Sequence, residues 1–147
     1  MNRIQFHTAE NTPLPFNDKK HYSHWLSAVA LAENKYISKI DYIFCSDAFL
    51  KQINIEYLNH DYYTDIITFP YKEGDNIESD IYISTDRVKE NAHDYGVAFE
   101  EELRRVMVHG LLHLIGYNDV TDEESALMRV KEDFYIADFE NSKLTPS

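Results

Sequence analysis

The sequence has one cysteine, few basic residues and no long hydrophobic run, and each shortage excludes a class of protein. Cys45 is the only cysteine in 147 residues, so no disulfide can form within the chain, as is typical of a reducing cytoplasm. No stretch approaches the roughly 18 apolar residues of a membrane-spanning helix. Residues 1–20 contain no apolar segment of a signal peptide. We therefore expect a soluble, cytoplasmic protein with no membrane association.

Basic residues are scarce, with 14 Lys and Arg against 26 Asp and Glu and a formal net charge of −12. A general nucleic-acid binder normally has a basic surface, so we expect no DNA partner. Any polyanionic substrate would have to meet a local patch. The candidates are Lys19 with Lys20, Arg87 with Lys89, and Arg104 with Arg105. The simpler interpretation of each pair is an ordinary exposed face.

The composition is that of a globular chain, with 44% hydrophobic and 14% aromatic residues. No internal repeat, low-complexity tract or linker divides it, so residues 1–147 form a single expected domain. Residues 141–147 are expected to fray. Cys45 closes an apolar run and is expected to be a buried, inert thiol at the end of a strand.

Two histidines, a glycine and an aspartate form the most informative motif. His109 and His113 are four residues apart, so on a helix they lie on one face, one turn apart. Gly116 permits the left-handed backbone that ends a helix and turns the chain back. After this turn, the side chain of Asp119 can reach the same point as the two imidazoles. Two imidazoles and a carboxylate suit one zinc ion with an open fourth position, which is a catalytic type of site.

A buried histidine is often only a packed core residue, and this alternative has to be weighed. From Val106 the expected helix is apolar nearly all round, which predicts burial. Two buried imidazoles would each need a partner, and one shared metal satisfies both. The spacing is also that of the metzincin proteases. Those enzymes carry glutamate after the first histidine as general base, whereas this chain has Gly110.

Hydrophobic periodicity and turn residues predict an α+β domain, with a small mixed sheet packed by helices and a buried metal-binding helix. The last helix should open at a capping box, Thr121 to Glu124. Glycine and the capping residues give the expected boundaries. Strands are expected near 4–6, 39–45, 65–69 and 80–84, with a hairpin at 74–76, and helices over 20–34, from 46 or 47, over 85–95 and over 98–115.

The run from His109 to Asp119 resembles the signature H-G-x-L-H-L-x-G-Y-D-H of the YbeY family of rRNA maturation factors. Two further segments resemble other blocks of that family in the same order. Residues 53–57 with 64–69 are similar to L-N-x-x-Y-R-x(5)-T-D-V-L-S-F, and residues 80–84 are similar to G-D-I-x-I-S. The resemblance covers about residues 40–135.

The resemblance implies a single-strand-specific endoribonuclease that uses a metal, usually zinc, in ribosomal RNA maturation. Ribosomal RNA and ribosomal particles would be its partners. His109 and His113 take the first two ligand positions, and Asp119 stands where the family has histidine. A water on the metal would be the reacting group, because no side chain can be named as general base. Thr64 and Asp65 are expected to line the substrate cleft.

Two other positions depart from the family blocks. Leu58 stands where the family has an arginine, a natural contact for phosphate. Arg87, Arg104 or Arg105 would have to replace it, and His60 is a further candidate donor that is more simply a surface histidine. Ser79 replaces a glycine. Two alternative functions remain open: a hydrolase of another substrate, and a ribosome-assembly protein with a structural metal.

Overall fold

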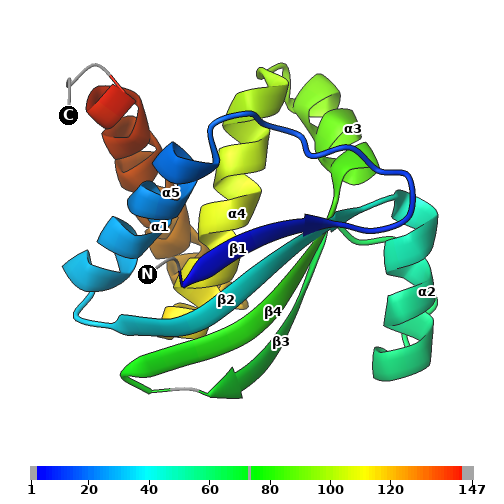
Figure 1. Cartoon of the computed structure of the whole chain (residues 1–147), viewed down its shortest axis with the longest axis horizontal. Helices are drawn as coiled ribbons and strands as arrows, with labels where there is room; N and C mark the ends of the chain where they lie inside the picture. The colour runs from blue at the N-terminus through cyan, green and yellow to red at the C-terminus, as the bar shows by residue number, and fades with distance from the viewer. Residues whose placement is uncertain (1–2, 73, 144–147) are drawn as a thin grey trace.

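Four strands form one mixed sheet in the order β1-β2-β4-β3 (Figure 1). The computed structural model describes residues 3–72 and 74–143, without the side chains of residues 142 and 143. β1 (Ile4–Thr8) and β4 (Asn76–Ser84) both pair in parallel with β2 (Tyr36–Cys45). β3 (Ile66–Lys72) pairs antiparallel with β4 at the edge of the sheet.

Helices cover both faces of this sheet. α1 (Lys19–Ala32), α4 (Phe99–Ile115) and α5 (Asp122–Lys143) lie on one side, and α2 (Asp47–Leu58) lies on the other (Figure 1). α3 (Thr85–Tyr95) follows β4 and packs against α4. Successive side chains of β4 point to opposite faces of the sheet, so this strand contributes to the packing on both faces. Ile81 and Ile83 face the larger core under α4, and Tyr82 packs against the smaller cluster around α2.

Local capping fixes where the helices begin and end. The Ser46 side chain accepts a hydrogen bond from Phe49 N at 3.1 Å, which opens α2. Gly96 ends α3 with a φ of 68°. Thr121 and Glu124 exchange two 3.0 Å hydrogen bonds, so the predicted capping box is formed.

The predicted fold class is confirmed, as are the hairpin between β3 and β4 and the helix over residues 85–95. β2 begins three residues before its expected start at 39. α5 continues through residues 141–143, and residues 144–147, on which the rest of the expected fraying falls, lie outside the described part. Cys45 is fully buried, and burial raises the pKa of its thiol to about 12. Among the described residues, no helix has the length and apolar character needed to cross a membrane.

Candidate metal centre

α4 carries both predicted histidine ligands and packs tightly against the sheet. A Cβ atom on Gly110 would lie 2.7 Å from Cδ1 of Ile66 and 3.5 Å from Cγ2 of Ile81. Gly110 therefore allows the helix backbone to approach β3 and β4 closely. A side chain at residue 110 would point at these isoleucines, so a glutamate of the metzincin kind at this position would be directed at apolar side chains of the sheet.

His109 is oriented by a buried carboxylate on α5. Its Nδ1 atom lies 2.7 Å from Oε2 of Glu132, and Oε1 of Glu132 lies 3.0 Å from Nη1 of Arg105. A carboxylate paired with arginine is an acceptor, so Nδ1 of His109 donates the proton of this hydrogen bond. The bond to Glu132 raises the pKa of His109, against the opposing effect of burial. The second nitrogen, Nε2, keeps a free lone pair in the neutral ring.

Asp119 approaches that second nitrogen. Its Oδ2 atom lies 3.4 Å from Nε2 of His109, beyond the usual 2.7–3.2 Å hydrogen-bond range. A tetrahedral zinc ion with bonds of about 2.0–2.2 Å holds neighbouring donor atoms about 3.3–3.6 Å apart. This pair of side chains therefore fits a shared metal ion, both in its donor types and in its spacing.

His113 completes the predicted set in sequence, but its side chain does not join the other two. It lies in the last turn of α4 and is exposed. In the described part of the chain, no three His, Cys, Asp or Glu side chains form a group that could hold a metal ion. The structure brings two of the three predicted ligands together, and the complete three-ligand site stays a prediction.

The turn between α4 and Asp119 is connected to both α1 and α5. Gly116 has a φ of 130° and caps α4, which confirms its predicted turn. The next residue, Tyr117, donates from its hydroxyl to Glu33 at 2.6 Å. Glu33 follows the end of α1 and also accepts from Lys131 at 3.1 Å and from Tyr135, both on α5. One carboxylate thus connects α1, the turn and α5.

A cleft of about 610 Å³ contains the His109–Asp119 pair. Its walls come from the start of β3, from α4 and from the first half of α5. Four carboxylates line it, against the two arginines Arg105 and Arg129; the acidic residues are Asp65, Glu102, Asp119 and Glu132. Such a carboxylate-rich site attracts cations and repels a phosphate unless positive charge is added.

Asp65 lies at this cleft, directly before β3, whereas Thr64 is not among its lining residues. Burial raises the pKa of Asp65 above its ordinary value, and the nearby His109 and Arg87 oppose that shift. The Thr64 hydroxyl instead lies 3.4 Å from the carbonyl oxygen of Ile66. The structure thus places one of the two predicted cleft residues at the cleft.

The cations proposed to replace the family arginine have other partners. Arg104 is buried, pairs with Glu140 and packs over the Phe139 ring. Arg87 pairs with Asp47 at 2.7 Å. Arg105 lines the cleft but is bound to Glu132 and to Asp133.

Arg129 is a cation that the sequence interpretation overlooked. It is exposed, lines the cleft and forms no ion pair with the residues that the structure describes. Leu58 and His60 are not among the lining residues of the cleft, and the His60 ring stacks on Tyr62. Arg129 is therefore the cleft cation that is available to meet a phosphate.

Glu132 was also overlooked, although the sequence contains a signal for it. Buried residues recur along α5 at helical spacing, and Glu132 is the charged member of that face. The others are Met128, Tyr135, Ile136 and Phe139. A carboxylate on the apolar face of a helix has to find a buried partner. Leu127, Val130 and Phe134, which are further apolar residues of α5, are exposed.

A histidine held by a buried carboxylate, beside an aspartate and open to a cleft, is the arrangement of a metal-dependent hydrolase and not of a closed structural site. Comparison with known proteins gives the family. The family model of Endoribonuclease YbeY matches residues 4–140, and the chain belongs to this family.

Relatives at high identity cover most of the chain. The Endoribonuclease YbeY of Flavobacterium johnsoniae is 50% identical over 128 residues, which are 87% of this chain and 92% of the relative. That of Flavobacterium psychrophilum is 57% identical over 112 residues, covering 76% and 80% of the two chains. The solution structure of TM1509 from Thermotoga maritima is 27% identical, with a TM-score of 0.67, over 95% of this chain and 90% of that one.

Proposed function

We propose that this endoribonuclease cleaves single-stranded segments of ribosomal RNA at the cleft between α4, α5 and β3, with one zinc ion held by His109, His113 and Asp119. Membership in the endoribonuclease family supplies the reaction class. The observation that carries the site is the His109–Asp119 pair, oriented by Glu132 and spaced for a shared ion. Ribosomal particles in the cytoplasm are the proposed setting.

The side chains of the cleft have distinct tasks. Glu132 fixes the ring of His109 and keeps the proton on Nδ1, so that Nε2 faces Asp119. A bound zinc ion would add positive charge beside the phosphate and lower the pKa of a coordinated water to about 7. Arg129 contacts a non-bridging phosphate oxygen and offsets the surrounding carboxylates. Asp65, which lines the cleft, is the proposed acceptor of a hydrogen bond from a ribose hydroxyl.

The direct test of activity compares one RNA in single-stranded and duplex form. We expect the parent protein to cleave the single strand, and a His109→Ala variant purified identically to cleave neither. Equal cleavage by both preparations would identify a contaminating ribonuclease and contradict the proposal. Cleavage of the duplex as fast as the single strand would contradict the substrate class.

The role of Arg129 has its own test. Arg129→Gln should raise KM for RNA about 10- to 160-fold, because a charged hydrogen bond to phosphate is worth about 1.5–3 kcal/mol. Lys89→Gln is the matched control, since Lys89 is exposed on α3 and lies outside the cleft. An unchanged KM in Arg129→Gln would show that this arginine does not contact the substrate.

A further inference from the structure

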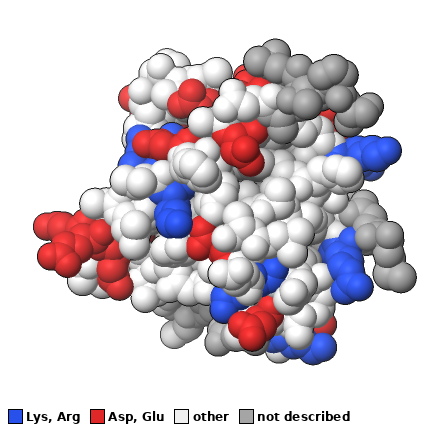
Figure 2. Space-filling model, turned by 90° about the vertical axis from the view of Figure 1, so that its left-hand side faces the viewer, with Lys and Arg blue, Asp and Glu red and all other residues white. Residues whose placement is uncertain are grey.

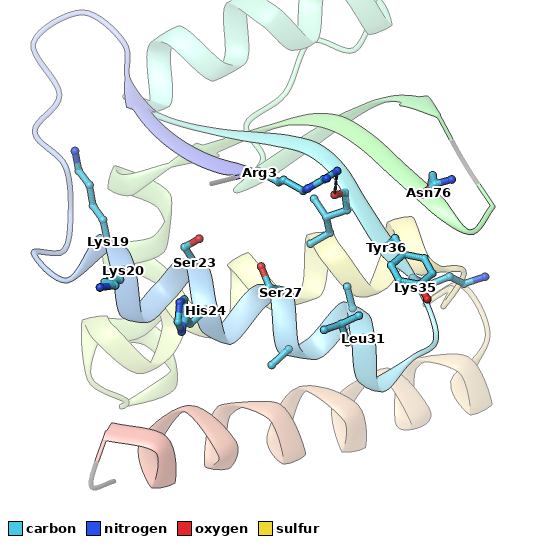
Figure 3. Close-up of a pocket in the computed structure, with 13 residues that line it drawn as sticks. Arg3, Lys19, Lys20, Ser23, His24, Ser27, Leu31, Lys35, Tyr36 and Asn76 are labelled. Carbon is cyan, nitrogen blue, oxygen red and sulfur yellow. Dashed lines mark hydrogen bonds between the residues drawn. The ribbon is translucent and has the colours of Figure 1, made fainter. Parts of the chain in front are cut away.

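A second groove lies outside the cleft, between the exposed side of α1 and the first residues of β1 and β2. It has a volume of about 1080 Å³ and shares no lining residue with the cleft. Lys19 and Lys20 lie at one end, and Lys35 and Tyr36 lie at the other, with Ser27 between them (Figure 3). Arg3 lies on the strand side of the same groove (Figure 3).

The groove is positive although the chain as a whole is acidic. Its lining contains four Lys and Arg side chains and no Asp or Glu, in a protein of net charge −12. Lys35 pairs with the exposed carboxylate of Asp75 at 3.3 Å. Arg3, Lys19 and Lys20 have no ion-pair partner among the described residues. Figure 2 shows lysine and arginine side chains at the right and the bottom of the face that it presents and also left of its centre, and acidic groups at its far left edge.

The ion-pair pattern sets this groove apart from the rest of the surface. Most lysine and arginine side chains in the described part of the chain are in ion pairs. Those without one are Arg3, Lys19, Lys20, Lys89 and Arg129, and three of these line this groove. Lys19 and Lys20 also occupy the first turn of α1, directly after the N-cap residue Asp18, whose carboxylate accepts a hydrogen bond from His21 N at 3.2 Å.

Tyr36 adds a flat apolar surface at the far end of the groove. Its side chain is 63% exposed, although it begins a strand. Proteins that bind single-stranded nucleic acid combine a positive groove for the backbone with aromatic side chains on which bases stack. The hydroxyl of Ser27 supplies a neutral donor between the two ends.

We propose that this groove binds single-stranded RNA, with Arg3, Lys19 and Lys20 contacting phosphates and Tyr36 stacking on a base. The inference rests on the proposed function in assuming that RNA is the polyanion that the protein meets. The groove holds a part of the strand remote from the cleaved bond. It supplies the positive charge that the carboxylate-rich cleft lacks.

The test measures binding of a fluorescent oligouridylate across salt concentrations, with a chelator present so that no cleavage occurs. Each phosphate contact on a single strand contributes about 0.7 to the slope of log K against log salt. Lys20→Gln should therefore flatten the slope by about 0.7. Lys19→Gln/Lys20→Gln should flatten it by about 1.4 and weaken binding about tenfold near 0.1 M salt. Glutamine keeps the helix propensity of lysine, so folding should be unaffected.

Matched controls separate the groove from general charge effects. Lys89→Gln removes the same charge from an exposed, unpaired position on α3 and should leave the slope unchanged. Tyr36→Ala should weaken RNA binding about fivefold or more, whereas Tyr57→Ala, at a 69% exposed tyrosine outside the groove, should not. Polyglutamate of similar charge should bind less tightly than RNA and should be insensitive to Tyr36→Ala.

The outcomes distinguish this proposal from the proposed function. Groove variants that bind RNA as the parent does, while the parent cleaves RNA, would overturn the groove and leave the catalytic assignment standing. A parent that binds RNA through the groove but never cleaves it would overturn the catalytic assignment alone. Polyglutamate binding as tight as RNA binding would overturn the groove as an RNA site and indicate an acidic protein segment as its occupant.

Discussion

At the residue scale, the cleft depends on the two different nitrogen atoms of His109. Nδ1 is committed to the buried carboxylate of Glu132, which leaves Nε2 directed at Asp119. The same carboxylate accepts from Arg105, so removing its charge disturbs both neighbours. Partners of this kind set the tautomer and raise the basicity of a ligating histidine.

Replacing Glu132 by Gln should therefore weaken zinc binding about 10- to 100-fold while the fold is retained. The measurement is a competition titration against a chelator of known affinity. Asp133→Asn is the matched control, because Asp133 contacts Arg105 at 2.8 Å and has no hydrogen bond to His109 among the described contacts. If both variants bind zinc equally tightly, Glu132 does not orient a ligand.

Asp119 gives the second prediction at this scale. Asp119→Ala deletes a donor and should weaken zinc binding by at least about tenfold, whereas Asp119→His supplies the imidazole of the family signature and should retain the ion. Asp122→Ala is the control, since it removes a nearby carboxylate that does not line the cleft. Full zinc affinity in Asp119→Ala would exclude Asp119 as a ligand.

At the element scale, the sequence predicts the helices and strands well but not how α5 is oriented. Capping residues and glycines act locally, so Gly96, Gly116 and the Thr121–Glu124 box place helix ends correctly. Which face of a helix is buried depends on what packs against it. α5 carries apolar residues on two faces, and only the face with Glu132 and Tyr135 meets α4 and α1.

The candidate site likewise has one part that local spacing predicts and another part that depends on packing between elements. The spacing of His109, His113 and Asp119 is local and was visible in the sequence. Asp65 directly precedes β3, whereas Arg129 and Glu132 both lie on α5. Only the packing of these two elements against α4 places the three residues at one cleft. Leu58 and His60 were chosen from a sequence block, but they lie at the end of α2 and after it, away from the cleft lining.

Glu33 gives a prediction about how the elements are held together. Burial alone would raise its pKa, but hydrogen bonds from Tyr117, Tyr135 and Lys131 lower it below its ordinary value. Glu33→Gln should therefore lower the free energy of unfolding by about 1–3 kcal/mol at pH 7. Zinc affinity should fall as well, because the turn that returns Asp119 loses its anchor.

The sign of the pH dependence follows from the lowered pKa. A carboxylate with a lowered folded-state pKa stabilises the protein above its unfolded-state pKa, about 4.3 for glutamate, and this stabilisation is lost as pH falls through the folded value. The difference between parent and Glu33→Gln in urea unfolding should be constant at neutral pH and shrink in acid. Glu56→Gln, at an exposed position on α2, should show little difference at any pH. A difference that grows in acid would contradict the assigned role.

At the scale of the whole molecule, charge is distributed unevenly. Carboxylates dominate the cleft where a metal ion would bind, and unpaired lysine and arginine side chains gather in the groove beside α1. In the proposed arrangement, the ion and Arg129 would neutralise the cleft and the groove would hold the rest of the strand, so that an acidic chain could bind RNA.

If RNA cleavage requires the proposed ion held by His109, His113 and Asp119, losing one of these ligands should abolish zinc binding and cleavage together. The most direct measurement determines zinc per chain and cleavage of single-stranded RNA on the same preparations of the parent, His113→Ala and His93→Ala. His93 is the control because its side chain is 91% exposed on α3, away from the cleft lining. The parent and His93→Ala should each hold about one zinc ion and cleave RNA, and His113→Ala should lose both properties. Retention of zinc and of full cleavage by His113→Ala would show that His113 is not a ligand of an ion that cleavage requires.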